Sequence, residues 1–264
     1  MESDTFSSED YSTVDSMIAN TGKRTSADLL RRTYNSIFLL KCLHYEGFLK
    51  DYSPSEMQQM GGCLLGLLQK FSCNAYNISC LSISNHDVKT SEYQEVGGAL
   101  YPTIARTNHA CCNNTLRVSV GKKCALFAIH SIPKGGEILD NYGQGFTENP
   151  VHVRNEVLVK QYLFLCTCDA CSNKWPTYNE LHQTPSQFKS NIKKSGKQLE
   201  NIMTEVEKTK SLLIKHETDK ALTQLCLLMG KLRDLVEVPS KHVFDLELVL
   251  AQALRMKGNI YYKN

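Results

Sequence analysis

A cluster of three cysteines constrains this chain most, because Cys166, Cys168 and Cys171 place three thiols on one short loop. A C-x-C-x-x-C run of this kind can supply three of the four ligands that a tetrahedral zinc ion takes from sulfur or nitrogen. The fourth ligand must then come from a distant part of the chain, which would fasten the loop to that part. We therefore predict a structural zinc site in preference to three free buried or redox-active thiols.

Several residues could complete this site, and spacing alone does not choose among them. The candidates are Cys111, Cys112, Cys124 and His109. The chain has 11 cysteines, and its first residues do not combine basic and apolar character as a secretory signal does. This combination favours a reducing compartment, in which thiols are buried or bound to metal rather than paired.

Composition and charge describe a globular chain without a marked ligand preference. The 264 residues, 42% of them hydrophobic, suit one large domain or two small ones. No apolar run reaches the roughly 18 residues that a membrane helix needs, so we expect no membrane partner. The formal net charge of +3 comes without a dense block of Lys and Arg, so we expect no specific nucleic-acid partner.

The first third of the chain changes from a polar tail to helical patterning. Residues 1–25 are rich in Ser, Thr, Asp and Glu and are expected to be a disordered acidic tail. Residues 26–92 are expected to be helical, with Ser26 as a helix N-cap and a second helix over about 56–71.

The middle of the chain has short apolar segments separated by turn residues. This pattern predicts a small β core over residues 93–148. Residues 116–120 alternate between apolar and polar side chains, and residues 124–129 follow a glycine-containing turn. We expect these two segments to pair as strands.

The last part of the chain is expected to be mostly helical. Residues 149–178 hold a short helix over about 153–163 and the cysteine loop, and apolar stripes predict a helical bundle over 179–264. Gly258-Asn259 resembles the turn of a helix-pair repeat, although one unit establishes no period. The expected fold class is therefore α+β.

Four segments in a fixed order resemble the SET- and MYND-domain family of protein-lysine methyltransferases. They are Leu100-Tyr101-Pro102, Asn108-His109-Ala110-Cys111, Asn141-Tyr142-Gly143 and the run Tyr-x-Phe-x-Cys-x-Cys-x-x-Cys from Tyr162 to Cys171. The resemblance covers about residues 60–175 and is weak over the helical C-terminus. Tyr142-Gly143 is most similar to the subgroup that carries C-terminal helical, TPR-like repeats.

The resemblance implies an activity and a division of the chain. The family transfers methyl groups from S-adenosylmethionine to lysine side chains of histone or non-histone proteins, in the cytoplasm and the nucleus. Residues 93–148 would form the SET-like core, 149–178 the post-SET zinc segment and 179–264 the TPR-like region, which could bind protein partners. The resemblance also implies that Cys111 is the fourth zinc ligand, beside Cys166, Cys168 and Cys171.

The resemblance further implies a cofactor and lysine site. Asn108 and His109 would contact S-adenosylmethionine, and Tyr162 and Phe164 would flank the cofactor and the lysine channel. Tyr142 would stand at the reacting centre and bind the cofactor, so Tyr142 and Tyr162 are the expected catalytic residues.

The chain also departs from the family pattern. The Gly-x-Gly strand and the MYND finger that normally precede this core are not visible, so we expect a truncated chain that binds the cofactor weakly or not at all. Arg106 and Thr107 stand where the family has apolar residues, and a buried unpaired arginine would be costly. The alternative reading is a catalytically inactive SET-like, zinc-containing scaffold for protein–protein interaction.

Overall fold

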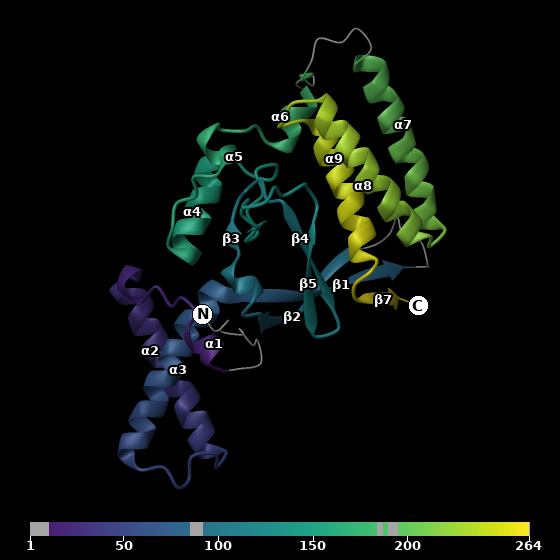
Figure 1. The fold of residues 1–264 in the computed structure, drawn as a ribbon. Coiled ribbons are helices and arrows are strands. Elements are labelled where there is room, and N and C mark those ends of the chain that lie inside the picture. Colours follow the sequence, from purple (N-terminus) through teal and green to yellow (C-terminus); the bar gives the residue numbers. More distant parts are fainter. Residues whose placement is uncertain (1–10, 85–91, 184–186, 190–194, 264) are drawn as a thin grey trace. The chain divides into compact units, whose positions relative to one another are not determined.

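The computed structural model describes residues 11–84, 92–183, 187–189 and 195–263, and these form two compact units (Figure 1). The first unit contains Met1–Tyr76, Gly98–Arg106 and Glu156–Leu165, and the second contains Asn77–Gly97, Thr107–Asn155 and Cys166–Asn264. Helices and small sheets are both present, so the expected α+β class is confirmed. None of the described helices combines the length and the apolarity that a bilayer crossing requires.

The first unit is built around a helical hairpin. Its elements are α1 (Tyr11–Asp15), η1 (Thr21–Lys23), α2 (Ser26–Tyr45), α3 (Pro54–Asn74) and η3 (Ile104–Arg106). Thr25, and not Ser26, is the N-cap of α2, since its side chain accepts a hydrogen bond from the backbone of Asp28. A capping box between Ser53 and Glu56 starts α3, with a proline in its first turn.

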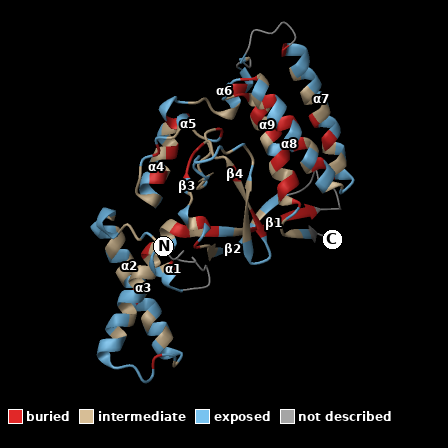
Figure 2. Cartoon of the chain, viewed as in Figure 1, coloured by how far each residue is buried: buried red, intermediate tan, exposed pale blue. Residues whose placement is uncertain are grey.

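The α2–α3 hairpin is held largely by polar contacts, because few of its apolar side chains are buried (Figure 2). Arg24 donates from Nη2 to the Gln69 carbonyl at 2.9 Å, and Arg32 donates from Nη1 to the Leu68 carbonyl at 2.6 Å. The Asp28 carboxylate pairs with Arg24, Arg31 and Arg32 at 2.8–2.9 Å. Hydrogen bonds from these arginines, with that of Arg32 the strongest, hold the pKa of Asp28 well below its usual range.

The prediction of a disordered tail over residues 1–25 was wrong for its second part, where α1 and η1 lie. Residues 1–10 lie outside the described part of the chain. The amide of Asn74 donates to the Ile18 carbonyl at 2.8 Å, and Lys70 forms an ion pair with Asp15. Such contacts between distant segments cannot be read from a polar composition.

In the described part of the chain, the strands form three small sheets. The three-stranded sheet has the order β2-β1-β7, with β1 (Ala75–Ser84), β2 (Glu92–Leu100) and β7 (Ile260–Lys263). A parallel pair joins β3 (Asn108–His109) to β6 (Leu139–Asp140), and an antiparallel hairpin joins β4 (Thr115–Val120) to β5 (Lys123–Ala128). The predicted strand pair at 116–120 and 124–129 is confirmed, with Gly121 in its turn at φ +59°.

Two strands and the first residue of a third were missed in the sequence. β1 and the start of β2 lie in residues 26–92, which were expected to be helical, and β7 follows Gly258-Asn259, which were expected to be a helix-pair turn. β1 pairs in parallel with β7, so each strand depends on a partner far away in the sequence. Gly258 permits this path, since a Cβ there would come within 2.5 Å of Val118 Cγ1. Asn259 then donates from its backbone to the Ser119 carbonyl at 2.9 Å.

The helices that follow the core include the predicted short helix, observed as α4 (Val151–Tyr162), and two further short helices. These are α5 (Asp169–Ser172) and α6 (Tyr178–Gln183), followed by the long helices α7 (Ser195–Ile214), α8 (Thr218–Leu235) and α9 (Lys241–Arg255). α8 packs against both α7 and α9 (Figure 1). Helical spacing places Ala221, Leu225 and Leu232 on one fully buried face of α8. The core that they share extends to Leu81 and Val118 of the strands.

Candidate functional site

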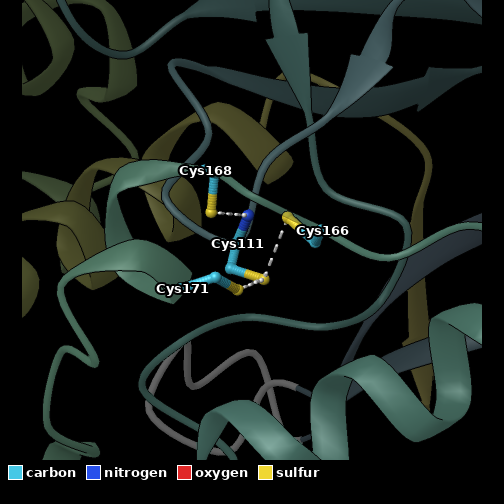
Figure 3. Close-up of side chains that lie close together, drawn as sticks. All are labelled: Cys111, Cys166, Cys168 and Cys171. Carbon is cyan, nitrogen blue, oxygen red and sulfur yellow. Dashed lines mark hydrogen bonds between the residues drawn. The ribbon is translucent and has the colours of Figure 1, made fainter.

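Four cysteines from two distant segments lie together in the second unit (Figure 3). Cys111 follows β3, while Cys166, Cys168 and Cys171 lie on the loop around α5. The Cys111 sulfur is 3.9 Å from that of Cys166 and 3.6 Å from that of Cys171. All four sulfurs lie within 4.8 Å of one another, and the backbone N–H of Cys111 donates to the Cys168 sulfur at 3.4 Å.

This sulfur geometry fits a tetrahedral zinc ion. Ligand bonds of about 2.3 Å around a tetrahedral centre place neighbouring sulfurs about 3.8 Å apart, close to the two separations measured from Cys111. A disulfide would need about 2.05 Å, and all of the cysteines are free thiols. The group Cys111, Cys166, Cys168 and Cys171 could therefore hold a zinc ion.

The other candidates for the fourth ligand do not belong to this group among the described residues. Cys124 lies on β5, and Cys112 follows Cys111 in the chain without joining the cluster, although a hydrogen bond with Cys168 raises the pKa of the Cys112 thiol. His109 contacts Cys111 as a hydrogen-bonding partner of its sulfur and is not itself among the clustered ligands.

The crowded sulfurs compete for protons when no cation offsets their charge. Hydrogen bonding with Cys166 and Cys168 raises the pKa of Cys111, whereas hydrogen bonds from Cys111 and Cys112 lower the pKa of Cys168. A divalent ion removes this conflict, because it stabilises thiolates and displaces their protons.

The loop takes its shape from backbone hydrogen bonds around α5. The N–H groups of Cys171 and Ser172 donate to the Cys168 carbonyl at 2.8 and 2.9 Å, and the N–H of Trp175 donates to the Ala170 carbonyl at 2.9 Å. The side chain of Asn155 accepts from the Cys166 N–H at 2.8 Å. These bonds turn the three loop cysteines toward Cys111.

A buried arginine at this site was missed in the sequence. Arg154 of α4 is fully buried, and its Nη2 lies 3.4 Å from both the Cys171 sulfur and the Ala170 carbonyl. The only sequence signal was its helical register, which puts it four positions before the fully buried Leu158. Charge alone would have assigned Arg154 to solvent.

His109 links the cysteines to Tyr142. Its Nδ1 accepts the backbone N–H of Tyr142 at 3.0 Å, so Nε2 carries the proton and faces the Cys111 sulfur at 3.3 Å. Burial is the main cause that lowers the pKa of His109 to about 4, which keeps the ring neutral. The His109 and Tyr142 ring centroids are 5.2 Å apart.

The segment around Tyr142 is fixed by its neighbours. The Tyr142 hydroxyl donates to the Thr107 carbonyl at 2.6 Å. The side-chain oxygen of Asn141 accepts from the N–H groups of Gly143 and Gln144 at 2.7 and 2.6 Å, which forms an Asx turn. In the Asn-Tyr-Gly motif only the tyrosine was assigned a role from the sequence, and the structural role of Asn141 was missed.

The remaining predicted site residues are Asn108, Tyr162 and Phe164. Asn108 is exposed on β3, and its amide donates to Glu137 Oε1 at 2.6 Å. Asn108, His109 and Tyr142 therefore belong to one local group in the second unit. Tyr162 and Phe164 belong to the first unit, so their position relative to Tyr142 stays a prediction.

The expectation of a costly buried charge at Arg106 was wrong. Arg106 ends the short helix η3 and is exposed to solvent. An exposed guanidinium loses no hydration, so this departure from the family pattern carries no penalty for the core.

No family model matches the chain, but several known proteins are similar to parts of it. The chain is 26% identical over 180 residues to N-lysine methyltransferase SMYD2-A of Xenopus laevis, which covers 66% of the chain and 38% of that protein. It is 31% identical over 129 residues to protein-lysine N-methyltransferase SMYD4 of Mus musculus, covering 47% of the chain and 16% of that protein. It is 34% identical over 104 residues to histone-lysine N-methyltransferase ASHR1 of Arabidopsis thaliana, covering 39% and 19%.

These matches are partial on both sides. The chain spans well under two thirds of the length of each of these curated relatives. The names of these relatives, from two animals and a plant, share one activity, the methylation of lysine.

Proposed function

On the premise that the chain is a divergent relative of the SET- and MYND-domain lysine methyltransferases, we propose that it serves protein-lysine N-methylation with S-adenosylmethionine as methyl donor. Its substrates would be lysine side chains of histone or non-histone proteins. The name of the Arabidopsis relative supports a histone substrate, and those of the animal relatives leave the protein open.

A continuous path of hydrogen bonds between the cysteines and Tyr142 carries this proposal. Cys111 is bonded to His109, and His109 is bonded to the backbone of Tyr142. Zinc bound by Cys111, Cys166, Cys168 and Cys171 would therefore fix the tyrosine proposed for the reacting centre. All four ligand positions would be filled by protein, so the ion would be structural.

The proposed reaction requires that the protein hold a neutral lysine amine in line with the methyl group of the donor. Lysine has an unperturbed pKa of about 10.4, so a site that excludes water favours the neutral form that can attack. The Tyr142 hydroxyl donates a hydrogen bond to the Thr107 carbonyl, and its oxygen can still accept a hydrogen bond from an N–H of the amine. Such a bond would turn the nitrogen lone pair toward the methyl group.

The cofactor would bind beside the same tyrosine. S-adenosylmethionine supplies the methyl group from a sulfonium, which is a cation. The Tyr142 ring suits a cation, because aromatic faces attract positive charge, and the family resemblance implies the same role for Tyr162 and Phe164. Asn108 offers a backbone and a side-chain amide next to His109, and these are groups that can bind the polar parts of such a cofactor.

A radiolabelled methyl-transfer assay on mixed histones and cell lysate tests the proposal. The assay uses S-adenosylmethionine at high concentration, which offsets the weak cofactor binding expected from the sequence. Under these conditions we expect transfer by the protein and at least a roughly 10-fold loss in Tyr142→Phe, since positioned catalytic groups typically contribute 10²–10⁴-fold. Tyr178→Phe is the matched control, because it removes a hydroxyl that binds Asp245 and not the Tyr142 group.

The outcomes separate the two readings of this chain. Transfer that depends on Tyr142 but not on Tyr178 supports the enzyme. No transfer by zinc-loaded wild-type protein would contradict it and leave the inactive scaffold, for which the α7–α9 bundle would offer the binding surface.

A further inference from the structure

Arg154 is a charged side chain in an unusual environment. It is fully buried, and it forms no ion pair with a carboxylate among the described residues. Its Nη1 donates to the Asn149 carbonyl at 2.5 Å, and its Nη2 faces the Ala170 carbonyl and the Cys171 sulfur, each at 3.4 Å. Its Nε is buried without a hydrogen-bond partner. A buried cation needs a counter-charge, and the nearest candidates here are sulfurs.

The cysteine group needs a cation besides the metal. Four thiolates around one divalent ion form a doubly negative centre, which is costly to bury unless positive charge or N–H groups face it. The backbone N–H of Cys111 and the Nε2 of neutral His109 supply only partial positive charge. Arg154 supplies a full positive charge.

The charges of Arg154 and the cysteines stabilise each other. Arg154 is fully buried and its Nη2 lies 3.4 Å from the Cys171 sulfur, so the guanidinium and a Cys171 thiolate each lower the cost of burying the other charge. The planar guanidinium also reaches several acceptors at once, which a lysine ammonium on a flexible stem cannot do in a fixed orientation.

We propose that Arg154 is a positioning residue of the zinc centre: its guanidinium neutralises part of the excess thiolate charge and fixes Cys171 against Cys111. This role rests on the proposed zinc site and adds a residue outside the four ligands. Asn149 orients the guanidinium through Nη1, which leaves Nη2 directed at the sulfur.

Competition titration with a chromogenic zinc chelator tests this role in the full chain. We expect Arg154→Met to bind zinc about 10- to 100-fold more weakly, the range found for residues that support metal ligands. Arg154→Lys keeps the positive charge but loses the planar guanidinium with its several N–H donors. Its zinc affinity is therefore expected to lie between those of Arg154→Met and wild type. Thiolate-to-metal absorption of the cobalt-loaded proteins reports whether the tetrahedral sulfur site persists.

Arg24→Met is the matched control. Arg24 is also buried and also contacts a cysteine, with Nη2 3.2 Å from the Cys73 sulfur, but Cys73 belongs to no metal group among the described residues. We expect this variant to bind zinc like wild type. Equal losses in the two methionine variants would overturn the proposal, because they would reflect general instability.

Each remaining outcome is decisive. Wild-type zinc affinity in Arg154→Met overturns the role of Arg154 and leaves the zinc site intact. Wild-type protein without zinc overturns the zinc site itself. If Arg154→Met does not fold, Arg154→Lys decides: zinc affinity weaker than that of wild type supports the role, and wild-type affinity overturns it.

Discussion

The cysteine loop and the α7–α9 bundle belong to one unit, yet different interactions hold them. The bundle buries Leu225, Leu232 and Leu246 completely, so apolar area removed from water stabilises it. Around the loop the buried groups include sulfurs, the Arg154 guanidinium and the His109 ring, and the apolar side chains buried beside them are the small Ala110 and Ala170. The helix α5 spans only four residues, too few to be stable without tertiary contacts. This difference leads us to expect that the loop depends on a bound ion for its stability and that the bundle does not.

The largest expected effect is the loss of a zinc ligand. Cys111→Ser should abolish tight zinc binding, which contributes about 10–16 kcal/mol in zinc-finger peptides. Hydrogen exchange should then accelerate in residues 166–175 and stay unchanged in α8 and α9. Cys226→Ser on the surface of α8 is the control and should change neither. Acceleration throughout α8 and α9 would break the comparison.

A substitution in the bundle should show the opposite pattern. Leu246→Ala removes a fully buried side chain and should cost about 2–5 kcal/mol of unfolding free energy, because it leaves a cavity. Thermal and denaturant unfolding followed by circular dichroism measures this cost. Leu248→Ala on the same helix is the control, since Leu248 is 49% exposed. Zinc content equal to wild type is expected in both variants, and its loss in Leu246→Ala would contradict independent stabilisation.

Tyr178 tests how strongly the two regions are coupled. It follows the cysteine loop, and its hydroxyl donates to Asp245 of α9 at 2.8 Å while its ring lies 5.2 Å from that of Phe244. Tyr178→Phe keeps the ring and removes one hydrogen bond, so about 0.5–1.5 kcal/mol should be lost. Denaturant unfolding measures this loss. A loss of zinc in the same variant would contradict the comparison, because it would mean that the cysteine loop and the bundle do not unfold independently.

The α2–α3 hairpin extends the comparison to a region with neither a metal site nor a large apolar core. Asp28→Asn should cost about 0.2–1 kcal/mol, as expected for partly exposed ion pairs. Because the pKa of Asp28 is depressed, its contribution is present above the unfolded pKa of about 3.9 and is lost as pH falls through the folded value. Unfolding at a series of acidic pH values measures this, with the exposed Asp51→Asn as control. An unchanged acid profile in Asp28→Asn would contradict the ion-pair account.

Local patterns in the sequence predicted the parts of the fold that local interactions build. The stripes of α8 and α9, the β4–β5 hairpin and the Cys166–Cys171 loop all follow from spacing within one segment. β1 and β7 were missed because each is stabilised by a partner distant in the sequence. The same reason explains why the structure of residues 11–25 was missed, since these residues contact α3, which is distant in the sequence.

The candidate site was predictable where it consists of motifs. The four cysteines predicted as zinc ligands do lie together, whereas the roles of Asn108, His109, Tyr142, Tyr162 and Phe164 stay proposals. Arg154 could not be found by pattern, because a buried arginine is defined by what surrounds it. Its partners Asn149, Ala170 and Cys171 come together only in the folded chain.

Elemental analysis of the purified protein tests the zinc centre most directly. The account predicts one zinc ion per wild-type chain, retained through purification without chelator and lost in Cys111→Ser but not in Cys226→Ser. Wild-type protein that is folded but free of metal, or a Cys111→Ser variant that retains its zinc, would contradict it.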